Sequence, residues 1–95
     1  MKIRITSNFY KKFDSQIDFV AKDKPLAARN FKKLVFKEIK KIKQMPFKNR
    51  KSIYVENDNS RDLIVKGYAI TYFINEVKNE IQVFGFTKWE EDINM

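Results

Sequence analysis

The side chains that could do chemistry in this chain are mostly cationic. The sequence has 20 Lys and Arg against 12 Asp and Glu, and it contains no His and no Cys. Without those two residue types, Ser-His and Cys-His catalysis and zinc sites built on Cys or His are excluded. Any catalysis would have to use Lys, Arg, Tyr, Asp or Glu, and we expect neither a metal ion nor another cofactor.

The positive charge is concentrated in the first part of the chain. Residues 1–55 carry 16 Lys and Arg against four acidic residues, whereas residues 56–95 carry four against eight. A surface of this kind attracts a polyanion or an acidic partner protein, because the summed charge steers association. The alternative is that much of this charge is solvated helix surface without a partner.

The length of 95 residues fits a single domain over residues 1–95 with one modest core, and a hydrophobic content of 43% can supply that core. No apolar run approaches the roughly 20 residues that span a bilayer. The N-terminus also lacks the continuous apolar region of a secretory signal. We therefore expect a cytoplasmic protein that does not enter a membrane.

Two helices must position the basic side chains. Capping residues at Thr6–Asn8 precede apolar positions that recur at helical spacing from Phe9 to Val20. Pro25 suits the first turn of a second helix, and Met45-Pro46 is expected to end that helix. So short a turn between two helices predicts an antiparallel helix hairpin.

Strands are predicted by alternation of apolar and polar residues at both ends of the chain. The first covers Lys2–Thr6, and a brief extended piece is expected at Ile53–Val55. The short connections Lys66-Gly67 and Asn75–Asn79 predict that the later strands form an antiparallel meander. These later strands are expected at Asp62–Val65, Tyr68–Ile74 and Glu80–Phe86.

The elements together predict a two-layer α+β domain of order β-α-α-β-β-β. A helix hairpin packs on a small antiparallel sheet, which the first strand joins beside a strand of the meander. In the last strand, the alternation places Ile81 and Val83 on one face of the sheet and Phe84 and Phe86 on the other.

This order of elements resembles the RelE/ParE superfamily of type II toxin–antitoxin toxins. The most specific part is the meander Arg61–Phe86, in which a hydrophobic strand is followed by Gly67-Tyr68 and an alternating strand that ends in Asn75. The segment AARNFKKLVFKEIKKIKQMP also looks like the second helix of the family. The resemblance implies a small cytosolic growth inhibitor that a cognate antitoxin neutralises. RelE-like members cut mRNA on the ribosome, and ParE-like members act on DNA gyrase.

Metal-free RNA cleavage needs a base for the 2′-hydroxyl, cations around the phosphate and an acid for the leaving oxygen. The position after Gly67-Tyr68, typically Arg in RelE-like nucleases, is Ala69 here, which carries no charge. If the chain is a nuclease, the remaining candidates are Arg61 and Lys88 as phosphate cations, Glu56 or Glu90 as the base, and Trp89 as a stacking platform.

The incomplete cation set favours a ParE-like toxin that binds DNA gyrase and is not an enzyme. A ribosome-dependent mRNA endoribonuclease and a non-toxic basic RNA-binding module remain as alternatives, and Ala69 also fits an inactive copy of the toxin. The residues expected to contact the target are Arg61, Lys66, Tyr68, Phe86, Lys88 and Trp89. Those expected to contact the antitoxin are Arg29, Lys33, Lys37 and Lys40.

Each of these residues also has a purely structural interpretation. Cations at strand ends, such as Arg61 and Lys66, are often solvated residues that discourage edge-to-edge pairing. Trp89 suits a cap over the end of a small core. Tyr68 and Tyr72 suit packing of the sheet under the helices.

Overall fold

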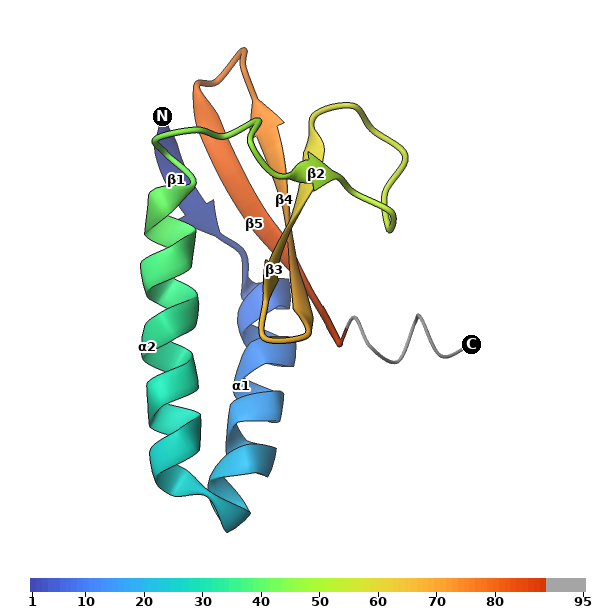
Figure 1. The fold of residues 1–95 in the computed structure, drawn as a ribbon. Coiled ribbons are helices and arrows are strands. Elements are labelled where there is room, and N and C mark those ends of the chain that lie inside the picture. The colour runs from blue at the N-terminus through green and yellow to red at the C-terminus, as the bar shows by residue number, and fades with distance from the viewer. Residues whose placement is uncertain (89–95) are drawn as a thin grey trace.

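The computed structural model describes residues 1–88 and shows two helices packed on one sheet (Figure 1). The predicted order of elements and the α+β class are confirmed, with one additional short strand before the meander. None of the helices in this part of the chain is long and apolar enough to cross a membrane. The elements are β1 (Lys2–Ile5), α1 (Ser7–Asp23), α2 (Pro25–Lys41), β2 (Arg50–Lys51), β3 (Ser60–Val65), β4 (Tyr68–Asn75) and β5 (Glu80–Lys88).

The helix hairpin forms as its local signals predict. Thr6 caps α1, because its side-chain oxygen Oγ1 accepts a hydrogen bond of 3.3 Å from the backbone N–H of Phe9. Only Lys24 separates the two helices, and Pro25 is the first residue of α2. The turn between the helices projects well beyond the end of the sheet (Figure 1).

Helix α2 ends at Lys41, earlier than the expected stop at Met45-Pro46. The backbone N–H of Ile42 bonds to the carbonyl of Ile39, and that of Gln44 bonds to the carbonyl of Lys41. These three-residue bonds tighten the last turn and satisfy groups that would otherwise continue the α-helical ladder.

The sheet has the strand order β1-β5-β4-β3-β2. Strands β3, β4 and β5 form the expected antiparallel meander, and β1 joins it beside β5. The expectation of a fully antiparallel sheet is wrong, because β1 pairs with β5 in parallel, with Ile3 opposite Ile81 and Ile5 opposite Val83. Both helices and the strands β2, β3 and β4 lie between β1 and β5 in the chain, so no tight turn forces the two strands to run in opposite directions.

The extended piece expected at Ile53–Val55 lies outside the strands. The short strand is β2, in which Arg50 and Lys51 pair with β3. The backbone N–H of Ile53 instead donates a hydrogen bond of 3.1 Å to carboxylate oxygen Oδ2 of Asp62. A side chain of β3 thus replaces the backbone acceptor that a continued strand would have used.

The turn between β3 and β4 is the predicted Lys66-Gly67. Both residues have positive φ angles, 48° and 83°. Positive φ at both central positions is the pattern of a type I′ hairpin turn, which matches the twist of the flanking strands. Gly67 adopts this conformation without a steric penalty, whereas Lys66 is a rare non-glycine residue in the left-handed region.

The core lies between the helices and one face of the sheet. The pairing of β4 with β5 shifts between Thr71 and Tyr72, and this bulge leaves Phe84 without a directly opposed partner. The shift returns Phe86 to the face that carries Ile81 and Val83. The prediction that Phe86 lies on the opposite face is therefore wrong. The buried cluster comprises Phe9, Phe13, Val35, Ile39, Ile42, Val65, Ile70, Tyr72, Ile74, Ile81, Val83 and Phe86.

Candidate functional site

A cationic pocket of about 350 Å³ lies between α1 and the paired ends of β4 and β5. Two of its lysines, Lys11 and Lys12, come from α1, and the third, Lys88, is the last residue of β5. We call this site the lysine pocket, and it contains three of the predicted target-contacting residues. It is lined by Lys11, Lys12, Ser15, Gln16, Tyr68, Phe86 and Lys88.

The floor of the lysine pocket is aromatic. The rings of Tyr68 and Phe86 stack with their centroids 5.0 Å apart and an angle of 10° between their planes. The amide nitrogen Nε2 of Gln16 donates a hydrogen bond of 2.9 Å to the hydroxyl oxygen of Tyr68. This bond fixes the phenol group and leaves its own proton available to an acceptor inside the pocket.

Phe86 lines the lysine pocket but is almost fully buried. Its ring packs at 5.3 Å from the ring of Phe13 and at 5.9 Å from that of Phe9, both in nearly perpendicular arrangements. The side chain is buried in the core. Phe86 therefore supports Tyr68 from below and does not project toward a partner.

Arg61 differs from both of its predicted interpretations, a phosphate cation and a solvated edge residue. Its guanidinium group donates hydrogen bonds to three backbone carbonyl oxygens, those of Phe47, Asn49 and Asp58, at 3.1–3.3 Å. The same group lies over the Phe47 ring, 5.1 Å from its centroid. Arg61 thus ties together the two segments that flank β2.

Ala69 lies in the middle of the sheet and is fully buried. Its strand neighbours are Ile64 on one side and Thr87 on the other. The position at which a RelE-like nuclease is expected to carry a cation therefore holds a small apolar side chain inside the protein.

Asp62 is a buried carboxylate that the sequence analysis did not single out. Oxygen Oδ1 accepts a hydrogen bond of 2.9 Å from the hydroxyl of Thr71, and Oδ2 accepts bonds from Arg50 at 3.3 Å and the N–H of Ile53 at 3.1 Å. Every partner belongs to β4 or to the segment around β2. The carboxylate is therefore used in joining these segments and is not presented to a ligand.

The hydroxyl of Tyr72 also forms hydrogen bonds within the protein. Its hydroxyl donates to the carbonyl of Pro46 at 2.6 Å and accepts from the side-chain amide of Asn49 at 3.1 Å. Burial raises the pKa of the Tyr72 phenol above its ordinary value, so the group stays protonated at neutral pH. It cannot act as a base there.

Glu56 lies far along the sheet from the lysine pocket. It lines a shallow hollow of about 420 Å³ in the loop between β2 and β3, together with Lys51 and Asp58. Ser60, where β3 begins, pairs with Phe73 near one end of β4, whereas Lys88 pairs with Tyr68 at the other end. The proposed base and the proposed cation are therefore not brought together.

The four predicted antitoxin-contacting residues share one surface of α2. They line a groove of about 640 Å³ that runs along the helix, which we call the α2 groove. No acidic residue is among the described residues that line it. The α2 groove is lined by Arg29, Lys32, Lys33, Phe36, Lys37, Lys40 and Lys41.

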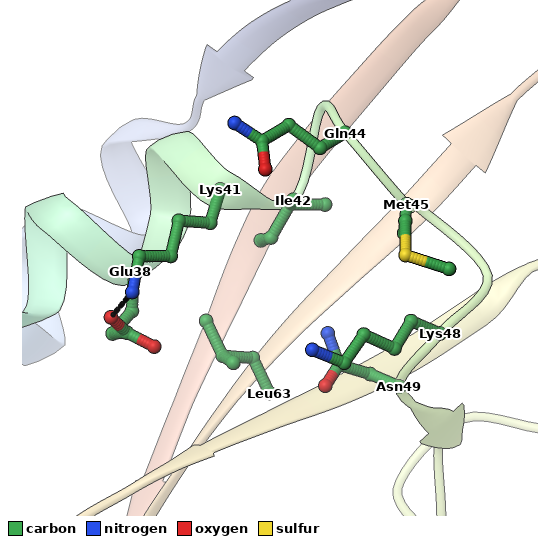
Figure 2. A pocket seen from close by; sticks show the side chains of 8 residues that line it. All are labelled: Glu38, Lys41, Ile42, Gln44, Met45, Lys48, Asn49 and Leu63. Atoms are coloured by element: carbon green, nitrogen blue, oxygen red, sulfur yellow. Dashed lines mark ion pairs between the residues drawn. The ribbon is translucent and has the colours of Figure 1, made fainter.

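A smaller pocket of about 120 Å³ lies at the end of α2. Figure 2 shows its side chains coming from α2, from the segment that leads to β2, and from Leu63 of β3. The carboxylate of Glu38 forms an ion pair of 2.9 Å with Lys41 at its wall. Glu38 offsets one of the two lysines that line this pocket, Lys41 and Lys48, so it is a poorer anion site than the lysine pocket.

Of the remaining predicted site residues, the structure describes only Lys66. Lys66 lines an apolar groove of about 520 Å³ between the helix hairpin and the β3–β4 turn, together with Phe31 and Leu34. Trp89 and Glu90 lie outside the described residues. Among residues 1–88, no cluster of three or more Asp and Glu side chains is arranged to hold a metal ion.

The comparisons with known proteins identify the class of this protein. Residues 3–92 match the family described as the ParE toxin of the type II toxin–antitoxin system parDE. The chain is therefore the toxin component of a type II toxin–antitoxin system, and its partner is a cognate antitoxin. Within that class, it belongs to the ParE toxin family.

The fold has a close counterpart among solved structures. A chain from the chromosomal ParDE toxin–antitoxin system of P. aeruginosa superposes with a TM-score of 0.75 at 15% sequence identity. The match covers 93% of this chain and 95% of that one. No curated protein sequence matches the chain.

Sequence reasoning missed Lys11, Lys12, Ser15 and Gln16. Their spacing placed them on one face of α1, but nothing in the sequence indicated that this face meets the ends of β4 and β5. The signal that could have found them was the excess of polar residues beside the apolar positions Phe9 and Phe13.

Proposed function

We propose that this ParE-family toxin arrests growth by binding DNA gyrase and does not cut RNA. The observation that carries the proposal is the set of contacts made by Arg61. Its guanidinium group donates hydrogen bonds to three backbone carbonyl oxygens and lies over the Phe47 ring. A cation held in this way cannot move to a scissile phosphate without releasing the segments around β2.

Two further requirements of RNA cleavage are not met by the described residues, and this supports the same proposal. Ala69 supplies no charge, and Glu56 and Lys88 line separate pockets. A general base must come within about 3 Å of the proton that it removes, directly or through one water. A toxin that acts by binding a protein needs no such constellation. We place its action in the cytoplasm, where a single domain of this size would meet gyrase.

The proposed target is tested with purified components. The toxin is expected to inhibit DNA supercoiling by gyrase and to accumulate broken DNA held by the enzyme, while transcripts in arrested cells stay intact. Addition of the cognate antitoxin should relieve the inhibition. Codon-specific mRNA cleavage on translating ribosomes, lost in Lys88→Ala, would instead establish the endoribonuclease alternative.

We further propose that the α2 groove binds an acidic helix of the antitoxin. Its cations repeat every three or four residues, so they lie along one side of α2. Within residues 1–88, β2 pairs only with Arg61 and Asp62 of β3, so the edge of β3 at Leu63–Val65 has no strand beside it on that side. An antitoxin segment could extend the sheet there by strand addition.

Reversing one charge in the α2 groove should weaken antitoxin binding. Lys37→Glu is expected to raise the dissociation constant roughly tenfold at low salt and less at high salt, because salt screens exposed charges. The new carboxylate would lie four residues from Lys33 and from Lys41, so α2 itself should keep its stability. The control is Lys78→Glu at the exposed β4–β5 turn, which makes the same change in net charge. Equal weakening by both variants, measured by calorimetric titration, would refute a specific role of the groove.

A further inference from the structure

We propose that the lysine pocket binds backbone phosphates of a DNA strand. This inference deepens the proposed function and takes its biological setting from it, since gyrase holds DNA while it acts. The chemistry of the pocket can nevertheless be measured on free DNA without gyrase.

The charge of the lysine pocket favours an anion. Lysines reach it from two elements, α1 and β5, and no carboxylate is among the described residues that line it. By contrast, Glu38 lines the pocket at the end of α2, and Glu56 and Asp58 line the hollow in the β2–β3 loop. Ammonium groups that line one pocket neutralise phosphate charge, and this neutralisation supplies most of the free energy of nonspecific binding to DNA.

Neutral hydrogen-bond donors accompany the lysines. The Ser15 hydroxyl lies at the wall, and the Tyr68 hydroxyl is held by Gln16 with its own proton left to donate. Hydroxyl groups of this kind are common partners of phosphate oxygens in protein–DNA complexes. The ring of Tyr68, which stacks on the buried ring of Phe86, provides an apolar surface for the sugar beside the phosphate.

The size of the pocket distinguishes its ligand from that of the α2 groove. A volume of about 350 Å³ accommodates a phosphate with its sugar but not an α-helix, whose diameter with side chains is roughly 10–12 Å. The α2 groove is nearly twice as large and runs along a helix. The two cationic sites therefore suit different ligands, a nucleic-acid strand and an acidic helix.

The test is fluorescence polarisation with short labelled DNA duplexes, DNA single strands and RNA of the same sequence, over a series of salt concentrations. The pocket variant is Lys11→Gln/Lys12→Gln, and the matched control is Lys43→Gln/Lys78→Gln, which removes the same charge from exposed positions outside the pocket. Each phosphate contact contributes about 0.9 to the slope of log affinity against log salt on duplex DNA. The pocket variant should lose tenfold or more in affinity and about one to two units of slope, and the control should keep the wild-type slope.

A second variant tests the hydroxyl without removing charge. Tyr68→Phe retains the ring that stacks on Phe86, so it should bind DNA several-fold more weakly with an unchanged salt slope. Similar affinity for DNA and RNA supports recognition of the shared phosphate backbone, whereas binding to RNA alone overturns the assignment to DNA.

The inference is also overturned if the pocket variant binds DNA like the wild type, or if the control loses as much affinity as the pocket variant. Wild-type toxin that inhibits gyrase but shows no affinity for free DNA would refute this inference and leave the proposed target standing. DNA binding without gyrase inhibition would refute the target and leave the pocket assignment in place.

Discussion

Replacing Asp62 with alanine is expected to lower the free energy of unfolding by about 2–4 kcal/mol, measured by urea denaturation at neutral pH. The carboxylate is only 1% exposed and accepts bonds from the Thr71 hydroxyl, the Ile53 N–H and the Arg50 guanidinium. Alanine would leave the buried Thr71 hydroxyl without its acceptor, which costs more than the loss of the bond itself, and would remove the acceptor of the part-buried Ile53 N–H. The Arg50 side chain is 37% exposed and can turn to water, which keeps the cost below that of a fully buried ion pair.

The matched control for this prediction is Asp58→Ala. Asp58 forms an ion pair with Lys51 at 3.3 Å, but its side chain is 90% exposed. Exposed pairs of this kind contribute at most about 1 kcal/mol, so the control should unfold at nearly the wild-type urea concentration. If the two alanine variants proved equally stable, Asp62 would not be the link that holds the β2 segment to the sheet.

Phe13→Ala should destabilise the protein by about 3–5 kcal/mol, because it removes a fully buried ring and leaves a cavity. The ring of Phe13 lies 5.3 Å from those of Phe9 and Phe86 and 5.5 Å from that of Phe36. It therefore joins α1, α2 and β5 in one cluster. Domains of this size have total stabilities of about 5–15 kcal/mol, so the variant should melt at a much lower temperature or fail to fold.

Phe19→Ala is the control for this core substitution. Phe19 belongs to the same helix and is the same residue type, but it is 70% exposed. Its removal should change the stability by no more than about 0.5 kcal/mol. A loss at Phe19 comparable to that at Phe13, in thermal or urea unfolding, would contradict the assignment of the core to the sheet side of α1.

Local signals in the sequence were sufficient to predict the two helices and the meander. The capping oxygen of Thr6, the fixed φ of Pro25 and the turn Lys66-Gly67 each act within a few residues, and the structure uses all three as predicted. The short connections between the late strands then left only an antiparallel arrangement. The order of elements and the family resemblance followed from these features.

The features that were missed depend on contacts between distant segments. The direction of β1 is set by its pairing with β5, and the face of Phe86 is set by a bulge that alternation alone cannot indicate. Arg61 looked like an exposed strand-end cation because the segments whose carbonyls it binds are irregular in sequence. The lysine pocket was missed for the same reason, since α1 meets β4 and β5 only in the folded chain.

The parallel pairing of β1 with β5 also sets when the molecule can be completed during synthesis. Ile5 cannot pair until Val83 has been synthesised, and ribosomes add about 5–20 residues per second, so roughly 4–16 seconds separate the two residues. During that interval the nascent chain holds its first strand without the neighbour that orients it. Both cationic surfaces therefore reach their final relative positions only after β5, whose last residue Lys88 lines the lysine pocket, has been translated.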